Sequence, residues 1–251
     1  MKISLNRFDD FEAAKNKIIG VERQRPGIGT LSEKTTHAIL KNYYAPNEDN
    51  QEIPIENYVA DIYLNGEIIE IQTRHFYKMR DKLKAFLPVY PVTICYPIPK
   101  EKYLIWVDPE SGELSERRKS PLRGDIYNIF PELYRIKAFL KDSNLSFRLV
   151  LMNIDEYKIA DGWGKNNHNH STKLDRIPTK LINELEINRR EDYMQFIPFE
   201  LDGEFTSSQF AKAAKIPVSL SSQTINILYY MDIIDRVGKK GNSYIYKIND
   251  Y

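Results

Sequence analysis

Apolar and polar residues alternate most regularly over residues 59–72, on both sides of an Asn65-Gly66 pair. Alternation with a period of two predicts strands, and Asn-Gly between two such runs predicts a β-hairpin closed by a two-residue type I′ turn. Counting outward from the turn places Asp61 opposite Glu70, on one face of the hairpin. Because opposed like charges destabilise a sheet, this pair indicates a cation held between the two carboxylates.

The rest of the first 165 residues alternates predicted helices with predicted strands. Apolar residues at helical spacing predict helices over residues 8–19, 31–44, 76–86 and 126–140. Short apolar runs predict strands over residues 92–96, 103–107 and 146–152, and the polar residues 45–52 are typical of a turn. This alternation predicts an α/β domain over residues 1–165, with helices flanking the strands.

The pattern changes after residue 165. Residues 166–203 are interpreted as a polar loop followed by a helical connector over residues 175–200. From residue 204 onward, a short helix, a turn over residues 216–219 and a second helix over residues 220–234 precede two strands around a basic, glycine-rich tip. Helix, turn, helix and basic β-hairpin in this order predict a small winged helix-turn-helix domain over residues 204–251.

Composition narrows the class of protein. The 251 residues are 42% hydrophobic and 28% charged, as expected for a globular protein, and the net charge of +1 means that binding to nucleic acid would need local basic patches. The single cysteine, Cys95, excludes an internal disulfide. No signal-peptide pattern and no run of about 18 apolar residues occurs, so we expect a cytoplasmic protein without a membrane partner.

The spacing Asp61-x8-Glu70-x-Gln72 resembles the PD-(D/E)XK nuclease superfamily. The resemblance covers residues 29–107 and implies a restriction-endonuclease-like mixed sheet. It also implies that Asp61, Glu70 and the backbone carbonyl of Ile71 bind Mg²⁺ or Mn²⁺. The third motif residue is usually lysine, whereas some restriction enzymes of the superfamily carry the Glu-x-Gln form found here. A glutamate on the preceding helix is also typical, and Glu33 has that placement.

This set of residues has a coherent chemistry. Mg²⁺ prefers hard oxygen ligands, and a bound metal polarises a phosphodiester and lowers the pKa of a bound water. Gln72 can orient that water by hydrogen bonding, although an amide is not a strong base. Arg74, His75 and Lys78 follow immediately and can neutralise phosphates.

Each of these features also has a plain structural interpretation. Glu33 can form a capping box with Thr30, and Asp61 and Glu70 can lie on the solvated face of an antiparallel pair. Arg80, Lys82 and Lys84 are typical of the solvated side of an amphipathic helix. His168 and His170 form an HxH pattern, which a polar loop explains better than a zinc site.

The predicted winged helix supplies candidate contacts to DNA. Polar residues near the start of its second helix can read base edges or hold phosphates: Ser221, Ser222, Gln223 and Asn226. Residues at the tip of its hairpin suit the DNA backbone or minor groove: Lys239, Lys240 and Asn242. A winged helix that serves protein contacts is the alternative.

These expectations combine into one functional hypothesis. The order of a nuclease-like domain and a winged helix is similar to the endonuclease subunit of certain bacterial transposases. It predicts a metal-dependent endonuclease that hydrolyses DNA, with a homodimer or a partner subunit supplying the cut in the second strand. Gln72 in place of lysine keeps a second hypothesis open, namely a DNA-binding regulator with an inactive nuclease-like domain. A protein-interaction scaffold is the third.

Overall fold

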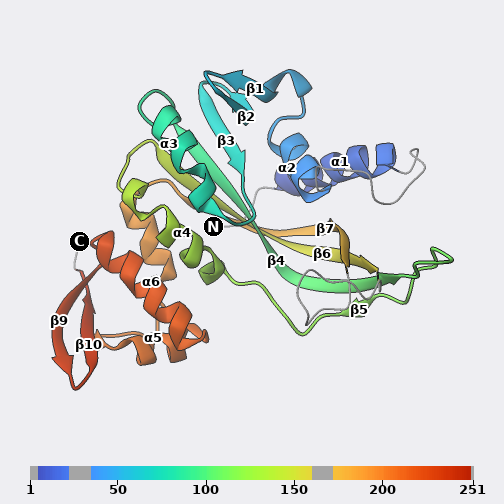
Figure 1. Ribbon diagram of the computed structural model, residues 1–251. Helices are drawn as coiled ribbons and strands as arrows, with labels where there is room; N and C mark the ends of the chain where they lie inside the picture. The colour runs from blue at the N-terminus through green and yellow to red at the C-terminus, as the bar shows by residue number, and fades with distance from the viewer. Residues whose placement is uncertain (1–4, 23–34, 160–171, 250–251) are drawn as a thin grey trace. The chain divides into compact units, whose positions relative to one another are not determined.

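The computed structural model describes residues 5–22, 35–159 and 172–249. Within them, one seven-stranded sheet has the strand order β1-β2-β3-β4-β6-β7, and β5 pairs with β4 (Figure 1). The strands are β1 (Gln51–Ile55), β2 (Tyr58–Leu64), β3 (Glu67–Ile71), β4 (Val92–Val107), β5 (Arg118–Lys119), β6 (Leu145–Ile159) and β7 (Thr172–Ile187). β1 runs antiparallel to β2 and β3 runs parallel to β4. The predicted α/β class, with a large mixed sheet flanked by helices, is therefore confirmed.

The helices differ from the predicted ones mainly in their bounds. The α-helices are α1 (Leu5–Glu22), α2 (Thr35–Tyr44), α3 (Arg80–Phe86), α4 (Phe130–Arg135), α5 (Ser207–Ala214) and α6 (Val218–Tyr230). Shorter 3-10 segments are η1 (Glu48–Asn50), η2 (Phe76–Met79), η3 (Ile126–Ile129), η4 (Lys137–Phe139) and η5 (Arg190–Phe196). Each of the helices predicted over 76–86 and 126–140 is thus a succession of short segments. No helix among the described residues is long and apolar enough to cross a membrane.

The chain divides into two compact units that share three long strands. The first unit comprises residues 1–64, 97–125 and 150–184, and the second comprises residues 65–96, 126–149 and 185–251. β4, β6 and β7 run from one unit into the other, since each contains a unit boundary.

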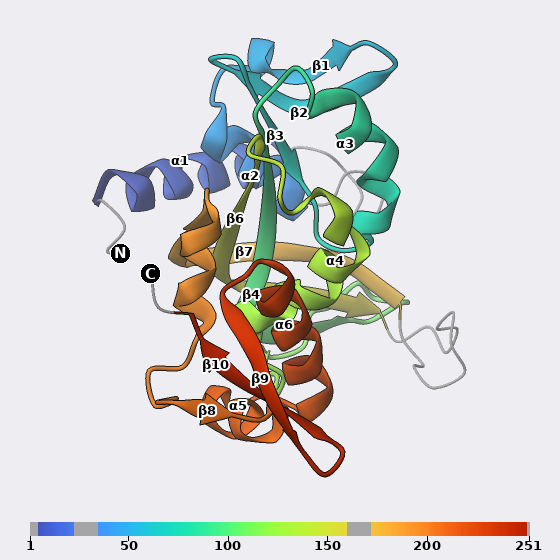
Figure 2. The same cartoon turned by 90° about the vertical axis from the view of Figure 1, so that its left-hand side faces the viewer.

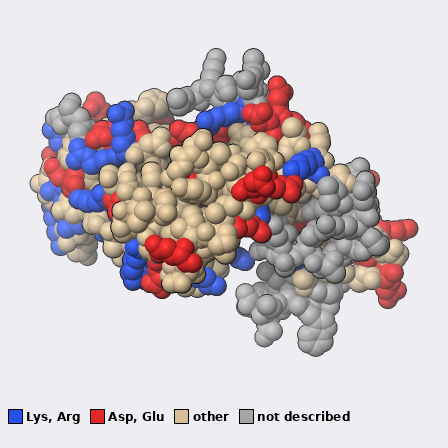
Figure 3. All heavy atoms as spheres, turned by 90° about the horizontal axis from the view of Figure 1, so that it is seen from above, with Lys and Arg blue, Asp and Glu red and all other residues tan. Residues whose placement is uncertain are grey.

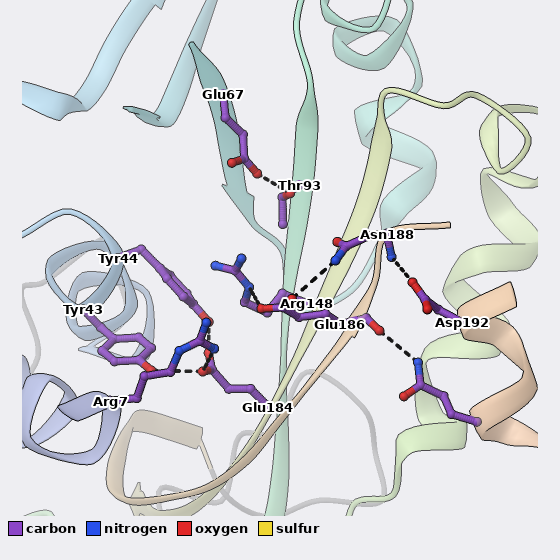
Figure 4. A network of polar contacts seen from close by, with 11 residues as sticks. Arg7, Tyr43, Tyr44, Glu67, Thr93, Arg148, Glu184, Glu186, Asn188 and Asp192 are labelled. Atoms are coloured by element: carbon purple, nitrogen blue, oxygen red, sulfur yellow. Dashed lines mark hydrogen bonds and ion pairs between the residues drawn. The ribbon is translucent and has the colours of Figure 1, made fainter. Parts of the chain in front are cut away.

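A buried carboxylate attaches the two N-terminal helices of the first unit to β7. Glu184 is 6% exposed, and its Oε2 accepts hydrogen bonds from Arg7 Nη1 at 2.6 Å and from the Tyr43 hydroxyl at 3.0 Å (Figure 4). The Tyr44 hydroxyl donates to the other oxygen, Oε1. A buried charge is costly unless it is paired and hydrogen-bonded, so these donors make Glu184 an anchor for α1 and α2.

The second unit contains a β3-α3-β4 crossover and an aromatic core. Parallel strands need such a crossover, and the register pairs Glu70 with Ile94. Phe86 of α3 is buried, and Phe130 packs edge-to-face on Phe196 with ring centroids 4.8 Å apart. Burial of aromatic rings of this size makes a large contribution to core stability.

The C-terminal part of the second unit contains the helices α5 and α6 and a small sheet (Figure 2). The strands β8 (Glu204–Phe205), β9 (Ile234–Lys240) and β10 (Ser243–Ile248) have the order β8-β10-β9. A capping box between Thr206 and Gln209 begins α5. The second helix was expected to reach residue 234, but it ends at Tyr230. Asp232 then has a left-handed φ of 57°, and Ile234 begins β9.

Two further expectations about the sheet are wrong. Residues 175–200 were expected to be a helical connector, but Thr172–Ile187 form β7 and only the short η5 follows. The runs 92–96 and 103–107 were expected to be two strands, but they are the two ends of β4. The sheet therefore extends beyond the predicted domain boundary at residue 165.

Candidate functional site

The predicted hairpin turn is confirmed. Asn65 and Gly66 separate β2 from β3 and have φ angles of 51° and 83°. Both central residues of a type I′ turn need positive φ, which asparagine and glycine adopt with the least strain. The turn agrees with the hairpin from which the register was counted, and the position of Asp61 opposite Glu70 stays a prediction from that count.

In the first unit, Asp61 contacts a histidine that the sequence analysis did not single out. His37 on α2 lies with Nε2 3.1 Å from Asp61 Oδ2, and both side chains are about one quarter exposed, at 24% and 23% respectively. The Glu184 anchor holds the helix that carries His37. An imidazole beside a carboxylate can exchange protons near neutral pH, so the pair adds a group with acid–base chemistry to the predicted site.

In the second unit, Glu70 is paired with a lysine. Glu70 is 6% exposed, and its Oε2 accepts a hydrogen bond of 2.6 Å from Lys82 Nζ. Lys82 was expected on the solvated side of its helix, and this is wrong, because its side chain is only 18% exposed. α3 is the crossover helix between β3 and β4, so it carries Lys82 back over the strand that holds Glu70.

The residues after Glu70 form a more exposed segment. Gln72 is half-buried, and its Nε2 donates a hydrogen bond of 2.5 Å to the Arg74 carbonyl. Its backbone N–H bonds the Cys95 carbonyl at 2.9 Å, which extends the pairing of β3 with β4 by one residue beyond Ile71. The three predicted phosphate contacts are exposed to solvent: Arg74, His75 and Lys78.

Two predicted groups lie outside the described residues. These are Glu33 with its capping partner Thr30, and the His168/His170 pair. Among the described residues, no three His, Cys, Asp or Glu side chains gather as a metal-binding group. The three-carboxylate form of the site therefore stays a prediction.

One predicted DNA contact on α6 is wrong. Ser221 was expected to be exposed, but it is fully buried, and its hydroxyl donates a hydrogen bond of 2.7 Å to the Ser207 carbonyl. It therefore joins α6 to the start of α5. Ser222, Gln223 and Asn226 are exposed as expected, and Asn226 Oδ1 accepts a hydrogen bond from Lys137 at 2.8 Å.

The tip of the β9–β10 hairpin presents its predicted polar residues to solvent. Lys239, Lys240 and Asn242 are all exposed around Gly241, which has a positive φ of 59°.

On the face that Figure 3 shows, basic and acidic side chains are interspersed around a largely uncharged centre. This mixture agrees with the small net charge, so any anion binding depends on particular clusters.

The described chain is an α/β protein built on a mixed sheet, and comparison with known proteins places that sheet in one family. Residues 34–188 match the family described as "Domain of unknown function (DUF8091)", and the chain belongs to it. The matched region extends from the start of α2 to the end of β7, so it contains every strand of the large sheet.

The comparisons also identify a relative. An "Uncharacterized protein" of Treponema pallidum (strain Nichols) is 29% identical over 167 residues, which are 66% of this chain and 64% of the relative. The match thus spans just under two thirds of the relative's length. No solved structure matches the chain.

Proposed function

We propose that the chain is a divalent-metal-dependent endonuclease that hydrolyses DNA phosphodiester bonds. The observation that carries the proposal is the Glu70–Lys82 pair, at 2.6 Å. The motif resemblance lacks its usual lysine at position 72, and the crossover helix supplies an ammonium group beside the motif glutamate instead. The pair therefore supports an active nuclease over a regulator with an inactive domain.

The donor groups fit a hard cation. Asp61 and Glu70 offer carboxylate oxygens and Ile71 offers a backbone carbonyl, which are the ligand types that Mg²⁺ and Mn²⁺ prefer. Asp61 and Glu70 are also largely shielded from solvent. When bound, the metal would polarise the phosphodiester and make a coordinated water more acidic.

The protein groups have separate roles in this proposal. Lys82 donates hydrogen bonds to the phosphate oxygens, on which negative charge develops in the transition state. Hydrogen bonds from a charged donor of this kind are strong. Gln72 orients the attacking water with its amide, and His37, beside Asp61, takes up or releases a proton. Arg74 and Lys78 hold the neighbouring phosphates.

The C-terminal elements suit the positioning of DNA. We interpret α5, α6 and the β9–β10 hairpin as a winged helix, with α6 presenting Ser222, Gln223 and Asn226 to the major groove. Lys239, Lys240 and Asn242 at the hairpin tip would contact the backbone or minor groove. Since one metal site cuts one strand, cleavage of a duplex would need a second copy or a partner subunit.

Cleavage assays with purified protein test the proposal. Supercoiled plasmid and single-stranded DNA are incubated with Mg²⁺ or Mn²⁺, and with EDTA as the metal-free control. Asp61→Asn and Glu70→Gln should each reduce the cleavage rate by at least about a hundredfold. Unchanged cleavage in both variants would overturn the site assignment. Metal-independent DNA binding without cleavage under either metal would favour the regulator.

The role of Lys82 has a matched control on the same helix. Lys82→Met should lose about a hundredfold in cleavage rate, because a donor to the transition-state charge is removed, and Lys82→Arg should recover part of the loss. Lys84 is exposed and pairs with Asp81 at 3.1 Å, so Lys84→Met should cleave as the unmodified protein does. Equal rates for Lys82→Met and Lys84→Met would show that Lys82 has no part in cleavage.

A further inference from the structure

A second charged cluster lies in the first unit, on β4, β6 and β7. Glu156 is fully buried, and its Oε2 accepts a hydrogen bond of 2.7 Å from Arg176 Nε. Lys102 Nζ and Lys158 Nζ each lie 3.6 Å from the other oxygen, Oε1. Within the described residues, Oε1 has no hydrogen-bond partner. Two ammonium groups are therefore ion-paired with a buried carboxylate oxygen without hydrogen-bonding it.

A fourth cation shows that positive charge is in excess. The pKa of Lys173 is lowered, first by burial and then by Arg176, with Lys102 and Lys158 acting in the same direction. Glu156 opposes this shift without cancelling it. Four cations thus share one carboxylate, and an anion bound between them would relieve their mutual repulsion.

An exposed aromatic ring adjoins this cluster. Trp106 is 37% exposed, and Lys158 Nζ lies 5.6 Å from its ring centroid. Trp106 is four residues after Lys102 on β4, and positions separated by an even number share a face of a strand. Phosphate-binding cations beside an exposed aromatic ring are the combination that single-stranded nucleic acids bind.

We propose that Lys102, Lys158, Lys173 and Trp106, which we call the Glu156 face, bind a single strand of nucleic acid. The lysines hold phosphate oxygens, and an unpaired base stacks on the indole. Arg176 keeps its bond to Glu156, so the carboxylate retains a partner while Lys102 and Lys158 turn to the phosphate. Paired bases in a duplex cannot offer a ring face to Trp106, which is why a single strand is favoured. This inference deepens the proposed function by naming the form of substrate that the first unit holds.

Fluorescence anisotropy of a fluorescein-labelled 15-nucleotide oligo(dT) tests the Glu156 face. The full chain is titrated in EDTA, which removes cleavage, and in a Lys239→Gln/Lys240→Gln background, so that the hairpin tip does not supply the signal. Trp106→Ala should weaken binding by at least about fivefold. Lys158→Gln and Lys173→Gln should each reduce the slope of log affinity against log salt by about 0.7.

The matched control is Lys17→Gln. Lys17 is an exposed lysine of the same unit that pairs with Glu48 at 2.8 Å, and its loss should leave the affinity and the salt slope unchanged. Thermal unfolding confirms that each variant is folded before binding is measured. Equal affinity in the unmodified protein and the three Glu156-face variants would overturn the inference, as would tighter binding of a 15-base-pair duplex than of oligo(dT).

The two proposals fail in different ways. If binding depends on the Glu156 face but no metal supports cleavage, the proposed nuclease activity is wrong and the single-strand binding site is retained. Cleavage that requires Asp61 and Glu70, with no effect of Trp106 or the lysines on binding, would remove this inference alone.

Discussion

The two faces of β4 and β6 in the first unit handle charge in opposite ways. On one face, Glu101 accepts a hydrogen bond of 2.6 Å from Lys119, and Asp155 accepts one of 2.9 Å from Arg117. On the other face, Lys102 and Lys158 share the single carboxylate of Glu156 at 3.6 Å. The residues are neighbours in the sequence, yet one face is balanced pair by pair and the other is not.

This difference distinguishes charged side chains that neutralise one another within the fold from charged side chains that can bind a ligand. One-to-one ion pairs leave little net charge to attract a ligand. The Arg117 guanidinium is further occupied by the Tyr103 ring, whose centroid lies 3.4 Å away. Around Glu156, three cations lie within 4 Å of one buried carboxylate, so positive charge is in excess there. Unbalanced charge of this kind costs folding free energy, so its presence favours a role in binding.

The largest contrast should come from removing one carboxylate on each face. Glu156→Ala should lower the free energy of unfolding by about 3 kcal/mol, because it leaves three cations, which are only partly exposed, without their carboxylate. Asp155→Ala should cost at most about 1 kcal/mol, because Arg117 is partly exposed and stays solvated. Urea denaturation of both variants measures the difference. Equal losses would show that the two faces do not differ energetically.

A smaller effect should appear in the dependence of stability on pH. Burial alone would raise the pKa of Glu156, but the Arg176 hydrogen bond and charge, with Lys102 and Lys173, hold that pKa below its usual value of 4.5. A carboxyl group with a lowered folded-state pKa stabilises the fold above pH 4.5, and this stability is lost as the pH falls through the folded-state pKa. Glu156→Gln should therefore flatten the acid limb of a plot of unfolding free energy against pH. An unchanged acid limb would contradict this assignment.

The smallest effect should differ in sign between the two faces. Lys173→Gln should raise the free energy of unfolding by a few tenths of a kcal/mol, because it removes one of several crowded, partly screened cations. Lys119→Gln should lower it slightly, because Glu101 loses its hydrogen-bonded partner. Chemical denaturation at low and high salt measures both, and salt should reduce both differences. A lower free energy of unfolding in Lys173→Gln would show that repulsion between Lys173 and the neighbouring cations does not destabilise the fold.

Sequence patterns within one segment predicted those parts of the fold that interactions within the same segment determine. Asn65-Gly66 specifies a turn by itself, because few residues accept two successive positive φ angles. The alternation of apolar runs likewise predicted the mixed α/β class. β7 was missed because its polar residues obscure the strand pattern, and one of them, Glu184, is buried. Glu184 is satisfied by Arg7, Tyr43 and Tyr44, which lie at least 140 positions away in the sequence.

The same limit applies to the candidate site. Lys82 looked like part of a solvated helix face, and only the packing of α3 over β3 brings it to Glu70. Ser221 looked exposed because its neighbours Ser219 and Ser222 are exposed, whereas the contact of α6 with α5 buries it. Side-chain partners that come from another element cannot be found by reading one segment at a time.

The length of β4 has a consequence for how this family can change. Lys102 and Tyr103 lie on opposite faces only because one position is even and the other odd along an unbroken strand of 16 residues. A single-residue deletion between Pro97 and Lys102 would exchange the two faces beyond it, moving Tyr103 to the face of Glu156 and Lys102 to the opposite face. Substitutions can therefore accumulate along this strand during evolution, while insertions and deletions within it should be excluded unless they come in pairs.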